Sequence, residues 1–221
     1  SCKSSSLASQ SEPMLMHVGM PSLYPGNVQE ILDYGLHGYM MSRLSGLWVG
    51  LKIVTNVADG SGTANVDPSR LNFVTPDMMF DGKPFTPHMN LGMNVRAEAL
   101  EMEQSLYTRR LEVAKRYAAA NKLNNVVFEN PDAWLGIITA GKTYNDLRQC
   151  FLELGLDDAA LRRYGIRILK MGMLFPMEPQ IVRDFARGLE EILVIEEKRP
   201  FLELFAKNVL YGMANAPRIV G

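Results

Sequence analysis

The chain has 221 residues, with 23 lysines and arginines against 24 aspartates and glutamates and a formal net charge of -1. Because these charges nearly cancel, no basic field is present to collect nucleic acid or an anionic membrane, and we expect neither partner. The two cysteines, Cys2 and Cys150, are too few for a four-thiolate cluster. No apolar run reaches membrane-spanning length, so we expect a cytoplasmic protein.

The first part of the chain is predicted to hold two strands around one helix. A short apolar run at 14–18 predicts a strand, and Asn27 with Glu30 predicts the capped start of a helix that Gly46 ends. Residues 47–54 predict a strand that is buried on both faces. A helix followed by a strand is the closing half of a βαβ unit, so we expect its opening half to precede Ser1.

The middle of the chain is predicted to be a linker followed by a long helix. Residues 68–95 are rich in proline and glycine signals and show no sustained apolar period, which leaves one short strand at 71–74. From Ala97 to about Asn121 the apolar residues recur at helical spacing. Residues 124–129 then predict a strand.

The stretch 134–197 alternates strand and helix in the rhythm of a parallel α/β sheet. Strands are predicted at 137–140, 166–171 and 192–196, with helices between them and after Pro200. The helix that follows the first of these strands is predicted to begin near Thr143 and to bury Leu147, Cys150, Phe151 and Leu154. The predicted fold class is therefore α/β, with two units that have mainly parallel sheets, the first of them incomplete.

One string in this stretch imitates a nucleotide-binding loop. Gly136, Gly141, Lys142 and Thr143 satisfy the pattern Gly-x-x-x-x-Gly-Lys-Ser/Thr. The residues between the glycines are mostly apolar and β-branched, which favours a strand that ends at Ala140 and turns tightly into a helix. A nucleotide hydrolase that uses Gly136–Thr143 is the less favoured alternative.

Other candidates for chemistry are sparse. His17, His37 and His88 are scattered, and no two have the spacing of a metal pair, so we interpret His37 as a packing residue. Adjacent strand residues point to opposite faces, so only one of Glu196 and Glu197 can face the carboxyl-end crevice of the sheet. Residue types and spacing alone indicate an α/β fragment without a complete active site. A non-catalytic α/β binding or oligomerisation module remains open.

Five long stretches carry a resemblance to a known family. The stretches are CKSSSLASQSE, NVQEILDYGLHGYMMSRLSGLWVGLK, LGIITAGKTYNDLRQ, GIRILKMGMLFPMEP and ILVIEEKRPFLE. Through them the chain resembles the fused, single-chain bacterial indolepyruvate ferredoxin oxidoreductases, which are 2-oxoacid:ferredoxin oxidoreductases, along nearly its whole length and in collinear order.

The resemblance implies a thiamine diphosphate enzyme. An aryl 2-oxoacid such as indolepyruvate would be decarboxylated and oxidised through 4Fe-4S clusters to ferredoxin, giving an acyl-coenzyme A. The Gly-Asp-Gly and Asn pattern that holds the diphosphate and Mg²⁺ is missing here, and so are the cluster cysteines. We therefore expect the fragment to be inactive alone, to contain no catalytic residue or metal ligand, and to bind none of these cofactors.

The resemblance also implies a domain division and a small set of site residues. Residues 1–67 would be the C-terminal part of the domain that binds the pyrimidine of thiamine diphosphate, 68–96 a linker, and 97–221 an α/β domain similar to the C-terminal domain of transketolases. Lys3, Ser4 and Ser5 match a polar turn near the cofactor and substrate pocket, and His17 falls near a substrate-binding position. The implied partners are the remaining domains, ferredoxin and coenzyme A, in a homo-oligomer.

Overall fold

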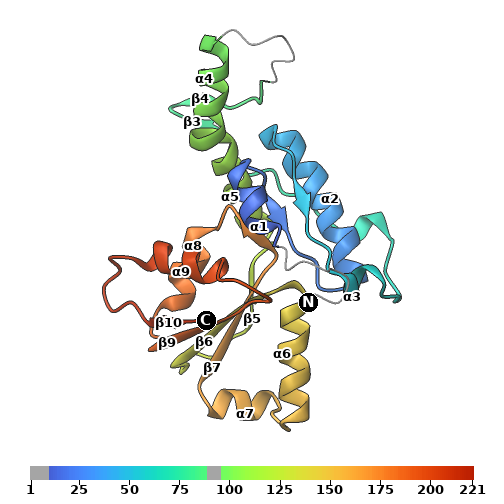
Figure 1. The fold of residues 1–221 in the computed structure, drawn as a ribbon, viewed down its shortest axis with the longest axis vertical. Coiled ribbons are helices and arrows are strands. Elements are labelled where there is room, and N and C mark those ends of the chain that lie inside the picture. The colour runs from blue at the N-terminus through green and yellow to red at the C-terminus, as the bar shows by residue number, and fades with distance from the viewer. Residues whose placement is uncertain (1–9, 89–95) are drawn as a thin grey trace.

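Five strands in the second half of the chain form one sheet with helices on both faces (Figure 1). The structure, a computed structural model, describes residues 10–88 and 96–221. The order across the sheet is β10-β9-β6-β7-β5, and every neighbouring pair is parallel except β5 with β7. The strands are β5 (Asn125–Phe128), β6 (Leu135–Ala140), β7 (Ile166–Met171), β9 (Glu191–Ile195) and β10 (Arg218–Val220).

Each face of this sheet is buried under two helices. On one face α6 (Gly141–Glu153) and α7 (Asp158–Arg163) pack against Ile137, and on the other α8 (Pro179–Ala186) and α9 (Leu202–Leu210) pack against Ile138. Successive strand residues point to opposite faces. A strand buried on both faces is therefore mainly apolar, as β6 is, and its one polar side chain, Thr139, is hydrogen-bonded to the Thr143 hydroxyl.

A smaller sheet joins residues near the N-terminus to the segment that follows β7. Its order is β2-β1-β8, with β1 (Ser22–Leu23) parallel to β2 (Gly50–Leu51) and antiparallel to β8 (Met173–Phe175). Only Gly172 separates β8 from β7, so this part of the chain leaves the large sheet and enters the small one at a single glycine. A side chain at Gly172 would collide with the Leu123 carbonyl and the Tyr34 hydroxyl, at 2.3 and 2.5 Å from the position of its Cβ.

Helices supply most of the remaining structure. The N-terminal region, defined here as residues 10–58, contains α1 (Glu12–His17), α2 (Val28–Ser45) and α3 (Thr55–Ala58) around β1 and β2. A 3-10 turn (Pro68–Arg70) and the hairpin of β3 (Met79–Phe80) and β4 (Lys83–Pro84) follow. A long helical run then comprises α4 (Arg96–Ser105), a π-helical turn (Leu106–Arg110) and α5 (Leu111–Ala120). No helix in the described ranges is long and apolar enough to cross a membrane.

Several local predictions are confirmed. Asn27 caps α2 by accepting the Glu30 N–H at 2.9 Å, and Gly46 ends that helix in the left-handed conformation with φ +71°. Asp157 caps α7 in the same way, through the Ala160 N–H at 2.8 Å. The predicted long helix and the strands at 124–129, 137–140, 166–171 and 192–196 are present, with ends that differ by one or two residues.

Other local predictions are wrong. In place of the strand predicted at 14–18, residues 14–17 belong to α1 and Val18 is its C-cap; Pro13 lies in the first turn, a position that proline favours. The strand predicted at 47–54 is limited to the half-buried β2, and residues 71–74 form no strand. Helix α6 begins at Gly141, and Cys150 and Leu154 are exposed, because Leu147 and Phe151 already form the face that packs on the sheet.

The main hydrophobic core is continuous between the N-terminal region and the C-terminal region, defined here as residues 124–221. Leu23 and Met41 from the first belong to the same buried cluster as Leu169, Met171 and Met173 from the second. The side chains of all five are fully buried. The two regions therefore share one core across the small sheet, whereas the domain division 1–67, 68–96 and 97–221 stays a prediction.

Candidate functional site

The carboxyl ends of β6 and β9 form the topological switch point of the large sheet. From β6 the chain passes through α6 to β7 on one side, and it later returns to β9 on the other side. Connections that leave in opposite directions open a crevice at the strand ends, where open α/β sheets bind their ligands. A ligand site is therefore expected in this crevice.

Side chains and backbone of the N-terminal region fill the crevice. The Tyr24 ring lies against Gly141, and a Cβ at Gly141 would be 2.4 Å from the nearest ring carbon. Asn145 of α6 donates to the Gly26 carbonyl at 2.7 Å, and Gly26 itself packs on the Gly141 carbonyl. The N-terminus of α6 is thus covered by protein at the point where a phosphate would have to bind.

Each residue of the nucleotide-loop pattern has a structural explanation. Gly136 lies under Phe185 and Leu189, whose atoms come within 2.8 Å of its Cβ position. Lys142 pairs with Asp146 one turn along α6, and the Thr143 hydroxyl donates to the Ala140 carbonyl at 2.7 Å. Residues 135–140 form a regular strand paired on both sides. The nucleotide-hydrolase alternative is therefore wrong, because that loop does not exist.

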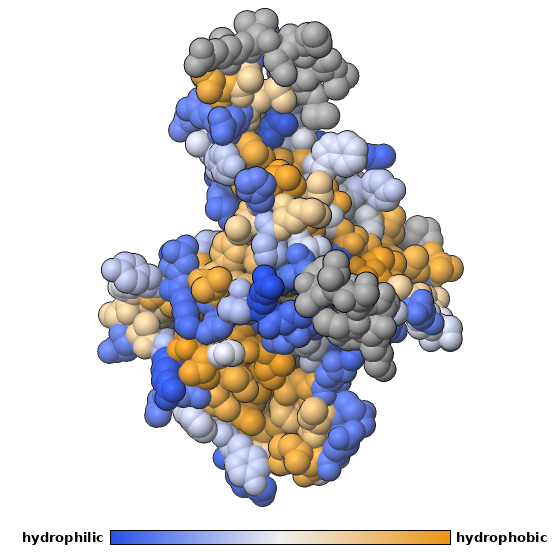
Figure 2. Space-filling model, viewed as in Figure 1, coloured by the Kyte–Doolittle hydropathy of each residue, from blue (hydrophilic) through white to orange (hydrophobic). Residues whose placement is uncertain are grey.

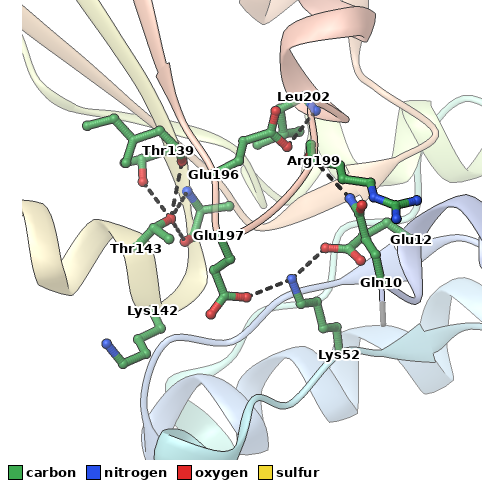
Figure 3. Close-up of polar contacts among 12 residues, drawn as sticks. Gln10, Glu12, Lys52, Thr139, Lys142, Thr143, Glu196, Glu197, Arg199 and Leu202 are labelled. Carbon is green, nitrogen blue, oxygen red and sulfur yellow. Dashed lines mark hydrogen bonds and ion pairs between the residues drawn. The ribbon is translucent and has the colours of Figure 1, made fainter. Parts of the chain in front are cut away.

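A buried cluster of charged side chains is centred on Lys52 (Figure 3). The Lys52 ammonium pairs with Glu12 of α1 and, at 3.0 Å, with Glu197 just beyond β9. It also lies 4.2 Å from the centre of the Tyr24 ring. Burial raises the pKa of the Glu197 carboxyl, whereas the ion pair with Lys52 lowers it. Burial raises the pKa of the Tyr24 hydroxyl far above its usual range.

Glu196 and Glu197 diverge, as the alternation of a strand predicts (Figure 3). Glu196 accepts three backbone N–H groups at the start of α9, those of Phe201, Leu202 and Glu203, at 2.8 to 3.1 Å. A carboxylate in this position satisfies free helical N–H groups and opposes the helix dipole. Glu196 is therefore a helix cap, and of the two neighbours only Glu197 takes part in the Lys52 cluster.

A cavity of about 330 Å³ lies next to this cluster. Its charged lining is balanced, with three acidic and three basic side chains, and its residues are Gln10, Ser11, Glu12, Met14, Lys52, Val54, Glu196, Glu197, Lys198 and Arg199. Balanced charge gives such a space no strong preference for an anion or a cation.

The residues do not fit a thiamine diphosphate and Mg²⁺ site. Within the described ranges, no three His, Cys, Asp or Glu side chains could hold a metal ion together. The α6 N-terminus, which is the helix end at the crevice, is closed by Tyr24 and Gly26. The ligands for a diphosphate and its metal are therefore not assembled from the part of the chain that the structure describes.

Of the four predicted site residues, only His17 is described by the structure. Lys3, Ser4 and Ser5 lie outside the described residues, and His17 is exposed at the last turn of α1, outside the Lys52 cluster. His37 is a packing residue as predicted: it is buried, its Nδ1 lies 2.9 Å from the Tyr117 hydroxyl, and burial lowers its pKa. The sequence signal for the cluster was Lys52 itself, a lone charge inside the apolar run 47–54.

A second concave feature lies on the other side of the small sheet. The α2 groove is an apolar groove of about 860 Å³ between α2 and β2. Tyr39 and Trp48 stand at its edge with 70% and 78% of their surfaces exposed. Apolar side chains gather at the surface over α2 in Figure 2. An apolar patch of this kind is typical of a protein contact.

Comparison with known proteins shows which proteins this chain is similar to. Residues 124–221 match the family described as "Indolepyruvate ferredoxin oxidoreductase middle domain". The chain is 30% identical over 184 residues to "Indolepyruvate oxidoreductase subunit IorA" of Methanothermobacter marburgensis, covering 83% of this chain and 27% of that subunit. The IorA subunit of Archaeoglobus fulgidus is 24% identical over 200 residues, covering 89% and 29%. The chain thus spans less than a third of the length of these relatives.

A solved structure agrees with this relationship at the level of the fold. It is a "2-oxoglutarate:ferredoxin oxidoreductase from Magnetococcus marinus with 2-oxoglutarate, coenzyme A and succinyl-CoA bound", which is 13% identical and covers 91% of this chain and 38% of that one, with a TM-score of 0.51. The chain is therefore a fragment related to the indolepyruvate ferredoxin oxidoreductases, and its residues 124–221 match the middle domain of that family.

Proposed function

We propose that this chain is part of a thiamine diphosphate-dependent oxidoreductase that oxidatively decarboxylates an aryl 2-oxoacid, such as indolepyruvate, to an acyl-coenzyme A. Ferredoxin accepts the electrons through 4Fe-4S clusters carried elsewhere in the enzyme. The observation that carries the proposal is the similarity to indolepyruvate oxidoreductase subunits along 83% of the chain. The shared fold with a 2-oxoglutarate:ferredoxin oxidoreductase supports it.

In this proposal the described residues organise the enzyme and do not carry the chemistry. Tyr24 and Lys52 attach the N-terminal region to the carboxyl ends of β6 and β9, and Glu196 orients α9 at the same edge. Positioning of domains is how a protein places a cofactor's reactive atom against its substrate. The cofactor would be held by other parts of the longer protein.

Lys3, Ser4, Ser5 and His17 are proposed to lie near the cofactor and substrate pocket of the complete enzyme. His17 is exposed on α1, so its imidazole is free to face a neighbouring domain. We further propose that the remaining domains and a second copy of the enzyme complete the assembly in the cytoplasm. The exposed aromatic edge of the α2 groove supports a contact of this kind.

The test is an activity assay on the complete enzyme, purified without oxygen. We expect indolepyruvate to reduce ferredoxin only when coenzyme A and thiamine diphosphate are both present, and to do so with a higher kcat/KM than pyruvate or 2-oxoglutarate. A preference for a short aliphatic 2-oxoacid would overturn the substrate class. Absence of reduction with every 2-oxoacid would overturn the reaction itself.

The proposed site residues are tested in the same enzyme. Replacing His17 by alanine is expected to raise the KM for indolepyruvate at least about tenfold, because a hydrogen bond between an imidazole and a substrate carboxylate is worth about 1.5 kcal/mol or more. His88→Ala is the matched control, because His88 lies in the linker. An unchanged KM in the His17 variant would remove His17 from the substrate pocket.

A further inference from the structure

The strand that joins the two regions is too short to fix its own position. β1 has two residues, and its pairing with β8 shifts register between Ser22 and Leu23. The backbone bonds near it are few, and they include Tyr24 N–H to Gly172 O at 2.9 Å and Lys52 N–H to Leu23 O at 2.8 Å. A strand of two residues makes few ladder hydrogen bonds, so other contacts must help to place β1.

Two lysines form ion pairs across the junction between the N-terminal and C-terminal regions, one lysine from each region. Lys52 extends from the N-terminal region to Glu197 after β9, while Lys170 extends from β7 to Glu30 in the first turn of α2. Each lysine also lies over an aromatic ring, Lys52 over Tyr24 and Lys170 over Tyr144, at 4.2 and 4.8 Å from the ring centres. All four charged side chains are at least four-fifths buried.

The two ion pairs lie close to both ends of the contact that β1 makes with its neighbouring strands. Glu30 lies in the first turn of α2, the helix that follows β1. Lys52 comes directly after β2, the parallel neighbour of β1. Lys170 stands two residues before Gly172, where the chain enters the small sheet. An altered register of β1 against β8 would separate Lys52 from Glu197 and Lys170 from Glu30 while those charges remain out of water.

A buried ion pair contributes little net stability, because desolvation offsets its attraction, but a broken one is strongly unfavourable. Such pairs are suited to selecting one arrangement over its neighbours. From this geometry we infer that Lys52 and Lys170 are positioning residues that fix β1 against β8, and thereby fix the N-terminal region on the C-terminal region. The inference concerns this chain's own residues and does not depend on the reaction proposed above.

The experiment replaces both pairs by neutral side chains of similar shape in the full 221-residue chain. One variant combines Lys170→Met with Glu30→Gln, whose amide oxygen can still accept the Gly26 N–H that Glu30 accepts at 2.8 Å. A second combines Lys52→Met, Glu12→Gln and Glu197→Gln. The matched control, Lys142→Met with Asp146→Asn, removes a lysine–carboxylate pair that lies within α6 and crosses no junction.

Amide hydrogen exchange is measured by NMR at three reporters. Tyr24 and Lys52 report the placement of β1, and Ile138 in the centre of β6 reports global stability. We expect exchange at Tyr24 and Lys52 to become at least about tenfold faster in both neutral variants, with less than about a twofold change at Ile138. The control is expected to change none of the three.

Unchanged exchange at Tyr24 and Lys52 would overturn the inference, and so would an equal acceleration at Ile138, which would indicate a general loss of stability. Two single substitutions at Lys170 test the same inference if the multiply substituted variants do not fold. Lys170→Arg retains the charge and should keep the protection of Tyr24, whereas Lys170→Gln should lose it. Equal protection in these two variants would also contradict the proposed role.

Discussion

The large and small sheets are specified by different kinds of contact. In the large sheet, β6 has six residues, pairs along its length with two parallel neighbours and is buried on both faces. In the small sheet no strand exceeds three residues, and its position depends on Gly172, on Asn124 and on the two lysines. The position of a long buried strand is specified by its own apolar sequence. The position of a two- or three-residue strand depends on contacts with side chains that are distant in the sequence.

The largest effect is expected where the two regions meet. Gly141→Ala places a methyl group against the Tyr24 ring in a residue with φ +48°, so it combines overpacking with backbone strain. We expect a loss of about 3 kcal/mol in the free energy of unfolding, measured by urea denaturation. Gly155→Ala is the control, because Gly155 has φ +67° and no atom within 4 Å of its Cβ position. Equal losses would show that the contact with Tyr24 is unimportant.

Substitution at the corner between the sheets, where the chain passes through Gly172, should reduce stability nearly as much. Asn124 accepts the N–H groups of Gly172 and Met173, each at 3.0 Å, and it is buried. Asn124→Ala would leave both donors without their acceptor, at a loss of about 2 kcal/mol in thermal or chemical unfolding. Asn125→Ala removes a neighbouring, exposed asparagine and should change stability by less than about 0.5 kcal/mol. A similar response of the two variants would contradict this account.

A smaller, pH-dependent effect is expected at the same corner. Burial raises the pKa of Glu178, which is only partly offset by the Asn124 amide that donates to it at 3.0 Å. A carboxyl whose pKa is raised by folding contributes stability below its unfolded pKa and loses that contribution as pH rises through the folded value. Glu178→Gln should therefore raise Tm more at pH 7 than at pH 4. An equal shift of Tm at both values would exclude the linkage.

The smallest effect on folding is expected at the α2 groove. We predict that the isolated chain self-associates through residues 28–54, and that Trp48→Ser weakens this association while leaving the urea midpoint unchanged, because Trp48 is 78% exposed. Tyr211→Ser is the control, since Tyr211 is 91% exposed and lies at the C-terminal end of α9, outside residues 28–54. Sedimentation over a range of concentrations measures the association. Monomeric behaviour of the unsubstituted chain would contradict the prediction.

Local signals in the sequence predicted the large sheet well. The apolar run of β6, the caps Asn27 and Asp157 and the terminating Gly46 each act within a few residues, so their consequences can be inferred without knowledge of the fold. The same sequence misled at 14–18, where five mostly apolar residues fit a strand or one side of a short helix. Periodicity alone cannot separate these two cases at that length.

The candidate site could not be predicted from the sequence. Lys52 and Glu197 are far apart in the chain, and neither the fit of Tyr24 against Gly141 nor the neighbours of Lys170 leave a local pattern. Only the presence of one lysine in an apolar run indicated that a buried charge needed a partner. The identity of that partner depends on how the N-terminal region packs on the sheet, which is a property of the tertiary structure.

The junction at Gly172 has a consequence for synthesis on the ribosome. The partner strand β8 is made about 120 residues after β2, which at about 5–20 residues per second takes roughly 6 to 24 seconds. During this interval Leu23 and Met41, both fully buried in the finished protein, have no β7 or β8 to pack against. The emerging chain therefore exposes an apolar surface that is a natural target for chaperones, and residues 10–58 complete their folding only after the last third of the segment begins to leave the exit tunnel.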